Sequence, residues 1–215
     1  MLSEKQVEEY KENGFVIMDY SLPKETLDEI KYYHKNLLDK YPEFRDYCPT
    51  LLKYDLNFLK YAKDPEILNC IKQLIGPNVA LWNQSFFAKP GINGKATPWH
   101  QDGQYWPIRP LATCSVWLAV DDSNEENGCL KYIPGSHKRK KTRLHHTNNS
   151  ENYTLNQELD TSEYNENDAY NLILKAGQMA LHDVYIVHGS GTNTSPHSRR
   201  GMTMRFMPTS STFDR

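Results

Sequence analysis

Two segments of the chain carry side chains whose types and spacing suit metal binding. In the first, TPWHQDG at residues 97–103, His100 and Asp102 stand two positions apart. Side chains at i and i+2 on an extended backbone point to the same face, so an imidazole and a carboxylate reach one ion. This spacing also occurs often by chance, so the pair needs a third ligand before it predicts a metal site.

The second segment, LHDVYIVHGSG at residues 181–191, supplies that ligand in His188, which ends an apolar stretch before a glycine-rich turn. Two histidines and one carboxylate form the facial triad of non-haem Fe(II) oxygenases, which leaves three coordination positions open. Arg199 follows across a turn and is a two-pronged partner for a carboxylate. This set suits a 2-oxoacid cosubstrate that chelates iron at one end and needs an anchor at the other.

The N-terminal part, residues 3–75, predicts helices that flank one short strand. Apolar residues recur at helical spacing behind Ser3, behind Pro23 and from residue 64 to 74. The apolar run 15–18 predicts the strand. His34 lies in the apolar stripe of the second helix, where we expect it to pack rather than to bind a metal.

The rest of the chain, about residues 78–208, predicts a β core. Expected strands lie at 79–88, 113–121, 178–187 and 201–207. Within the second of these, Ser115 and Trp117 belong to one face, and Val116 and Leu118 to the other. Short strands at this spacing predict a β-sandwich or jelly roll. The sequence contains no internal repeat and no linker, so residues 1–215 are expected to form a single domain.

Composition narrows the function classes. Lys plus Arg number 25 and Asp plus Glu number 27, a net charge of −2, whereas nucleic-acid binders usually carry a basic excess. No apolar run approaches the roughly 20 residues of a membrane span. The first residues, MLSEK, lack the pattern of a signal peptide. The four cysteines form no CxxC motif and suggest reduced thiols. We therefore expect a cytoplasmic protein with a small-molecule partner.

Residues 138–171 stand out as an insertion. A basic run at 138–143 is followed by a long polar tract. Polar insertions of this length in a compact domain are commonly lids or mobile loops. A basic run is most often a solvated face, and the adjacent His145 and His146 do not easily chelate one ion together. We expect the insertion to act as a lid.

The sequence resembles the phytanoyl-CoA dioxygenase family of Fe(II)- and 2-oxoglutarate-dependent oxygenases over essentially its whole length. The matching segments are WHQD at 99–102, the strand of Trp117, GCL at 128–130 with IPGSH at 133–137, and HGSG at 188–191 through Asn193 to Arg199.

This resemblance implies a mainly β fold with flanking helices, a double-stranded β-helix of the cupin-like jelly-roll type. It implies Fe(II) bound by His100, Asp102 and His188, and Arg199 as the anchor of the C5 carboxylate of 2-oxoglutarate. It also implies dioxygen as co-reactant and succinate as a product. Because Asp102 is present where related halogenases have a small residue, hydroxylation is favoured over halogenation. Positions that contact or flank 2-oxoglutarate, or face the substrate, are matched by Ser190, Gln101, Trp117 and Gln84.

Other residues compete for two of these roles. His182 stands six positions before His188, and a regular strand would place both on one face. The family spacing favours His188, which leaves His182 beside the ligands or in packing. Arg205 shares the parity of Arg199 and is a weaker rival, whereas Arg200 points the other way. We further expect that His137 braces a turn and that His197 is exposed.

The substrate is the least determined feature. The expected surrounding residues are Tyr105, Trp106, Arg109, Lys131 and Tyr132. The stretch from residue 100 to 113 resembles the branch that hydroxylates small aminophosphonates such as 2-aminoethylphosphonate. Alternatives are another small metabolite such as an amino acid or a betaine, an acyl-CoA ester, or a non-catalytic cupin-like metal-binding protein. A zinc hydrolase would give Arg199 no role. The sequence does not determine the oligomeric state.

Overall fold

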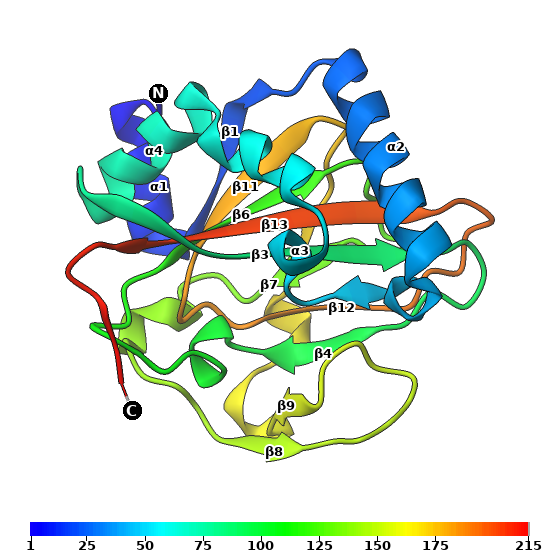
Figure 1. Ribbon diagram of the computed structural model, residues 1–215. Helices are drawn as coiled ribbons and strands as arrows, with labels where there is room; N and C mark the ends of the chain where they lie inside the picture. Colours follow the sequence, from blue (N-terminus) through cyan, green and yellow to red (C-terminus); the bar gives the residue numbers. More distant parts are fainter. Residues whose placement is uncertain (215) are drawn as a thin grey trace.

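The computed structural model describes residues 1–214 and contains two antiparallel sheets that face each other (Figure 1). The strands of the large sheet run in the order β1 (Phe15–Ser21), β11 (Gln178–Asp183), β6 (Cys114–Ala119), β13 (Arg199–Pro208), β3 (Val79–Lys89) and β2 (Tyr47–Cys48). Those of the small sheet run in the order β10 (Tyr170–Leu172), β7 (Leu130–Tyr132), β12 (His188–Ser190) and β4 (Thr97–His100). The predicted mainly β jelly roll with flanking helices is confirmed.

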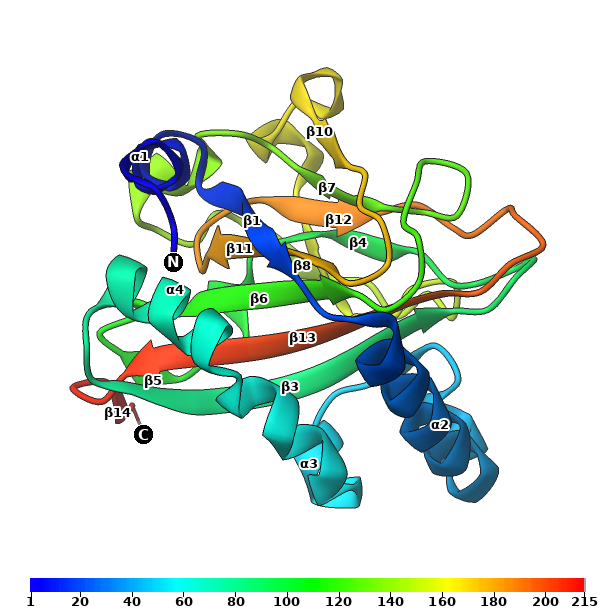
Figure 2. The ribbon, with the colours of Figure 1, turned by 90° about the horizontal axis from the view of Figure 1, so that it is seen from above.

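The helices cover the outer side of the large sheet (Figure 2). They are α1 (Glu4–Asn13), α2 (Lys24–Lys40), α3 (Leu51–Tyr54) and α4 (Pro65–Ile75), with a 3-10 segment at Leu56–Lys63. Helix α1 begins behind Ser3, as the sequence predicts, with a capping box between Ser3 and Gln6, and ends at Gly14. Helix α4 begins where the Asp64 side chain accepts hydrogen bonds from two backbone N–H groups. Local sequence signals therefore determine where these helices begin and end.

The alternation along the central strands separates the large sheet into two chemically different faces. On the outer face, Val116 and Leu118 are fully buried in a core shared with helix residues such as Ile30. Burying such a side chain contributes about 1.5–3 kcal/mol. On the inner face, the side chains of Ser115 and Trp117 point toward the small sheet and are also buried. The larger apolar core thus lies on the outer face, whereas the inner face combines the polar side chains of the site with a smaller apolar cluster that includes Trp117 and Tyr132.

One predicted strand is interrupted, and this changes the position of a histidine. The expected strand 178–187 ends at Asp183, because the Asp183 side chain accepts a hydrogen bond from Tyr185 N and its carbonyl accepts one from Ile186 N. Such an Asx turn ends strand pairing. The chain then enters β12 at His188, which belongs to the other sheet. His182 and His188 therefore do not share the face of one strand.

The insertion 138–171 is folded. It contains the hairpin β8 (His145–Thr147) and β9 (Gln157–Leu159), and Leu159 is completely buried. Backbone hydrogen bonds join Ala96 beside β4 to Asn152 and Thr154. The insertion therefore packs against the small sheet, while its closure over a substrate stays a prediction.

Three features complete the description of the fold. A further pair of strands joins β5 (Ile108–Arg109) to β14 (Thr212–Phe213). All four cysteines of the sequence are buried free thiols, in accord with the sequence-based expectation. Within the described part of the chain, no helix has both the length and the apolar character needed to cross a membrane.

His34 makes the stability of the fold depend on pH. It packs as expected, 4% exposed, with its ring stacked on Phe86 at 4.0 Å between centroids. Burial, assisted by the charge of Arg200, lowers its pKa from 6.5 to about 4. The unfolded chain therefore binds a proton at a higher pH than the folded one, and stability falls as the pH drops below 6.5 toward 4.

We expect this histidine to cost about 2 kcal/mol of unfolding free energy between pH 7 and pH 5. In His34→Leu, which keeps an apolar side chain of similar size, that part of the pH dependence should be absent. Urea unfolding at the two pH values measures it. Equal pH dependence in the wild type and in His34→Leu would contradict the prediction.

Candidate metal centre

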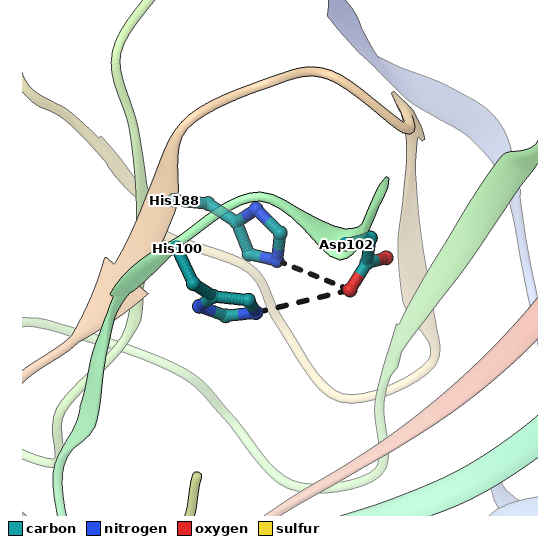
Figure 3. Close-up of side chains that lie close together, drawn as sticks. All are labelled: His100, Asp102 and His188. Carbon is teal, nitrogen blue, oxygen red and sulfur yellow. Dashed lines mark ion pairs between the residues drawn. The ribbon is translucent and has the colours of Figure 1, made fainter. Parts of the chain in front are cut away.

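The two histidines of the candidate centre form a cross-strand pair in the small sheet. His188 on β12 stands opposite His100 on β4, and the ring centroids are 4.1 Å apart (Figure 3). The Nδ1 atom of His100 lies 2.8 Å from Pro98 O, and that of His188 lies 3.0 Å from Ile186 O. Because a carbonyl only accepts, Nδ1 carries the proton in both rings. The Nε2 lone pairs are thus left to face a common point.

Asp102 completes the group from the 3-10 turn Asp102–Gln104, which directly follows β4. Its Oδ1 lies 3.8 Å from His100 Nε2 and 3.9 Å from His188 Nε2. The three candidate ligand atoms lie within 4.8 Å of one another, and all three side chains are buried. The structure therefore brings together the three residues that the sequence predicted as metal ligands.

The protonation states of this group suit a cation. Burial by itself raises the pKa of Asp102, but Arg205 and the neighbouring imidazoles outweigh it and hold the pKa well below its usual value. Burial, and then the neighbouring His100, lower the pKa of His188 well below 6.5. At neutral pH the centre thus offers an anionic carboxylate and a neutral imidazole, the forms that bind metals.

A cavity between the two sheets is lined by two of the three ligands, His100 and His188, and its free space, open solvent included, is about 380 Å³. Trp117 and Ser190 lie in its wall, where the family resemblance implied them. Gly201 allows Trp117 to do so, because a Cβ at this position would lie 2.6 Å from the indole ring. The lining residues are Phe87, Thr97, His100, Trp117, Leu130, His182, His188, Ser190, Arg199, Thr203 and Arg205.

Arg199 is a buried cation without a carboxylate partner in this cavity. It is 2% exposed, and its Nη2 donates to Gly128 O at 2.7 Å. Its Nε has no hydrogen-bond partner among residues 1–214. Burial lowers its pKa to about 10, so it remains charged at neutral pH. Lys89 stands opposite it on β3 and is also buried. Arg199 thus places a positive charge and an unused N–H donor at one end of the cavity, which suits the carboxylate of a bound ligand.

Two residues expected beside the cosubstrate point elsewhere. Gln84 lies on the outer face of the large sheet, where its amide donates to Phe58 O and contacts the sulfur of Met202. The amide of Gln101 is directed away from the metal ligands toward the 141–143 segment and Tyr185 O. Its neighbours His100 and Asp102 share one face, so Gln101 between them faces the other way. Gln101 therefore holds the insertion, and neither amide reaches the cavity.

Three of the expected substrate residues lie near the cavity. The ring of Tyr105 is 6.0 Å from that of His100, and the ring of Tyr132 is 6.1 Å from that of His188. The guanidinium of Arg205 lies over Trp106 at 5.4 Å. These aromatic side chains therefore lie beside residues of the site, although none of the three lines the cavity itself.

The other two substrate candidates are directed away from the cavity. Arg109 is exposed and pairs with Asp214 at 3.3 Å. Lys131 pairs with Glu166 at 3.4 Å. It alternates with Leu130 and Tyr132, which are both buried, so its side chain points outward. Closeness in sequence to the metal ligands misled the prediction for both cations.

The structure also places the residues that compete for the metal-ligand and carboxylate-anchor roles. His182 lies beside Asp102, with Nε2 3.5 Å from Oδ2, and its Nδ1 is 2.9 Å from Tyr132 OH. Arg200 pairs with Asp121 on the outer face, as its parity predicted. The ring of His137 contacts the backbone carbonyl of Lys11 in the last turn of helix α1, and His197 is exposed, as expected.

Arg205 is more important than the sequence indicated, because it contacts Asp102 and lines the cavity. Four further lining residues were not singled out. The period-two alternation from Arg199 would have identified one of them, Thr203, whereas Phe87 follows only from the pairing of β3 with β13. The four residues are Phe87, Thr97, Leu130 and Thr203.

Comparisons with known proteins agree with this geometry. The profile of the Phytanoyl-CoA dioxygenase (PhyH) family matches residues 10–201. Phytanoyl-CoA dioxygenase domain-containing protein 1 homolog of Dictyostelium discoideum is 34% identical over 158 residues, which cover 72% of this chain and 56% of the relative. Ectoine dioxygenase of Bordetella parapertussis is 31% identical over 163 residues, 67% of this chain and 51% of that protein. The chain thus spans little more than half the length of these curated relatives.

Solved structures show the same architecture. EvdO2 from Micromonospora carbonacea var. aurantiaca, in complex with 2-oxoglutarate, superposes with a TM-score of 0.81 at 20% identity, over 99% of this chain and 93% of that one. At this identity the likeness establishes the fold. Together with the match over residues 10–201, it leads to one conclusion: the chain belongs to the phytanoyl-CoA dioxygenase family.

Proposed function

We propose that this protein is an Fe(II)- and 2-oxoglutarate-dependent dioxygenase that hydroxylates a small polar metabolite. The observation that carries the proposal is the joint presence of two neighbouring features. They are the His100, Asp102 and His188 group and, in the wall of the cavity that the two histidines line, the Arg199 guanidinium, which has no carboxylate partner among residues 1–214. The first suits iron, and the second suits the distal carboxylate of a 2-oxoacid. Membership of the phytanoyl-CoA dioxygenase family supports both assignments.

Each part of the site has a distinct task in this proposal. His100, Asp102 and His188 hold the metal and leave one side of it open. Arg199 orients the cosubstrate, and Trp117, packed 5.4 Å from its guanidinium, closes that end of the cavity to water. Iron, 2-oxoglutarate and dioxygen together supply the oxidising power that hydroxylates a C–H bond. The chain contributes geometry, charge and the exclusion of water.

The size of the cavity favours a small substrate. The free space of about 380 Å³ beside the metal ligands includes open solvent, so its enclosed part is smaller still. The cosubstrate takes part of this space. A long acyl chain would require an extended groove, so an acyl-CoA ester fits less well. The relatives' names include both a phytanoyl-CoA and an ectoine dioxygenase, so family membership does not decide the substrate.

The charge of the cavity favours an acidic or zwitterionic substrate. Once Arg199 is committed to the cosubstrate, Arg205 remains as a second buried guanidinium in the wall. Trp106, which packs against the Arg205 guanidinium, and Tyr105, beside His100, lie just outside the cavity lining and offer aromatic rings for cation–π contact with an ammonium group. Arg109 and Lys131 do not contribute. An aminophosphonate such as 2-aminoethylphosphonate is therefore the first compound to test, followed by amino acids and betaines.

A non-catalytic, cupin-like metal-binding protein is the alternative from a different class. It would use the same three ligands but would give the buried Arg199 no partner. A zinc hydrolase has the same weakness. Succinate formation from 2-oxoglutarate by the iron-loaded protein in air distinguishes the oxygenase from both.

The metal ligands generate the first prediction for this function. His188→Ala, Asp102→Ala or His100→Ala should each abolish Fe(II)-dependent succinate formation, because each removes one of three ligands. His197→Ala, at an exposed histidine, is the matched control and should keep full activity. Loss of activity in His182→Ala with full activity in His188→Ala would show that the distal ligand is wrongly assigned.

The second prediction concerns the cosubstrate anchor. Truncating one partner of a buried ion pair typically costs about 2–5 kcal/mol, so Arg199→Ala should weaken apparent 2-oxoglutarate affinity by about tenfold or more. Iron should still bind. Arg200→Gln, on the opposite face of β13, is the control. Unchanged 2-oxoglutarate dependence in Arg199→Ala would move the anchoring role to Arg205.

The third prediction concerns the substrate. The wild-type enzyme is incubated with aminophosphonates, amino acids, betaines and acyl-CoA esters side by side, and consumption of 2-oxoglutarate is measured for each. The small acidic or zwitterionic compounds should stimulate consumption most, because they fit the volume and charge of the cavity. Preferential turnover of acyl-CoA esters would overturn the substrate class while leaving the oxygenase assignment intact.

A further inference from the structure

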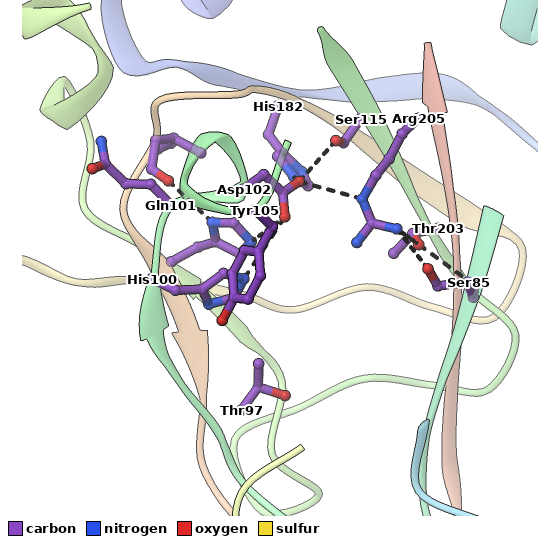
Figure 4. A network of polar contacts seen from close by, with 12 residues as sticks. Ser85, Thr97, His100, Gln101, Asp102, Tyr105, Ser115, His182, Thr203 and Arg205 are labelled. Carbon is purple, nitrogen blue, oxygen red and sulfur yellow. Dashed lines mark hydrogen bonds and ion pairs between the residues drawn. The ribbon is translucent and has the colours of Figure 1, made fainter. Parts of the chain in front are cut away.

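The two carboxylate oxygens of Asp102 have different surroundings (Figure 4). Oδ1 faces the Nε2 atoms of His100 and His188. Oδ2 faces the large sheet instead. There it accepts a hydrogen bond from Ser115 Oγ at 3.0 Å, and Arg205 Nε and His182 Nε2 each lie 3.5 Å away. One oxygen is thus directed to the metal position, and the other is surrounded by donors.

These three neighbours of Oδ2 form a single row across three adjacent strands. Ser115 on β6 stands directly opposite His182 on β11 and directly opposite Arg205 on β13. All three side chains are buried. Cross-strand neighbours on one face lie about 4.5–5.5 Å apart, so a single carboxylate oxygen reaches all of them. We call Ser115, His182 and Arg205 the donor row.

Arg205 is itself held in place. Its Nη1 donates to the hydroxyls of Ser85 and Thr203, each at 2.7 Å. Its guanidinium also lies over Phe87 at 6.0 Å and over Trp106 at 5.4 Å. Four contacts therefore fix the one atom, Nε, that meets Asp102. A side chain this constrained positions its partner and has little freedom to move away.

His182 is held as well. Its Nδ1 lies 2.9 Å from the hydroxyl of Tyr132, a fully buried residue of the small sheet. Its Nε2 has no hydrogen-bond partner within residues 1–214 and lies 3.5 Å from Asp102 Oδ2. The ring therefore spans the gap between the sheets and presents Nε2 toward Oδ2 of Asp102.

We propose that the donor row is a positioning device that restricts Asp102 to binding metal through Oδ1 alone. With Oδ2 occupied by the row, the carboxylate cannot chelate the ion with both oxygens, and the coordination position that a second oxygen would take stays open for cosubstrate or dioxygen. This inference rests on the proposed metal site. It assigns Ser115 and Arg205 a role in setting the coordination number, which does not depend on the substrate.

Metal titration of the apo protein without cosubstrate or substrate tests the inference. Co(II) is the probe, because its visible spectrum reports coordination number and geometry. Arg205→Met keeps the length of the side chain and removes its donors. Partners of metal ligands typically contribute 10–100-fold in affinity, so we expect Arg205→Met to bind Co(II) about 10–100-fold more weakly. We also expect its spectrum to change as Asp102 gains a second metal contact.

Two further variants control the experiment. Arg200→Met removes a guanidinium from the outer face, where Lys31 at 3.0 Å still pairs with Asp121, and should change neither affinity nor spectrum. Ser115→Ala removes a single oxygen. It replaces Arg205→Met as the test variant if Arg205→Met shows no cooperative unfolding transition and is therefore not folded. Arg205→Lys restores a donor cation and should recover part of the affinity. Loss of packing alone would not alter the Co(II) spectrum of a variant that still binds.

Unchanged affinity and an unchanged spectrum in Arg205→Met, or in Ser115→Ala where that variant carries the test, would overturn the inference. Its failure is distinct from that of the proposed function. A wild-type protein that binds Co(II) but forms no succinate when loaded with Fe(II) would refute the oxygenase while leaving the donor row in place. An active enzyme whose variants keep the wild-type Co(II) affinity and spectrum would refute the role of the donor row while leaving the oxygenase in place.

Discussion

A buried carboxylate between two sheets is the constraint on which this structure depends. Asp102 is 3% exposed, and an ionised carboxyl removed from water costs several kcal/mol unless cations and donors surround it. The small sheet supplies imidazoles on one side of it, and the large sheet supplies Ser115 and Arg205 on the other. The charge is therefore tolerable only when both sheets are in place, so the fold and the chemistry of the site share one requirement.

The pairing of strands determines where most of the candidate metal ligands lie. The pair of His100 and His188 exists because β4 and β12 are neighbours in the small sheet. That neighbourhood in turn requires the chain to leave the large sheet at Asp183 and to cross over within four residues, 184–187. The Asx turn at Asp183 is thus as necessary to the site as the ligands, although its own side chain does not contact them.

The sequence predicts features that depend on the spacing of nearby residues. It does not predict which face of a strand points inward, or side-chain directions that depend on contacts with residues far away in the sequence. The ligand group follows from two short segments, and the shared face of Ser115 and Trp117 follows from alternation. Alternation does not say which of two faces is inward, and the family resemblance assigns Gln84 to the cavity, whereas its pairing position opposite Met204 of β13 turns it outward. Arg109 and Lys131 failed for a related reason, because their directions are set by contacts with distant Asp214 and Glu166.

Arg199 and Lys89 are register partners on β13 and β3, so two like charges stand directly opposite each other inside the protein. Like charges at such positions weaken a sheet, and burial, together with the charge of Arg199, lowers the pKa of Lys89. The pairing of these two strands thus carries an electrostatic cost at this position. An anion held by Arg199 offsets the charge that opposes Lys89, so anion binding at Arg199 and the cohesion of the large sheet are thermodynamically linked.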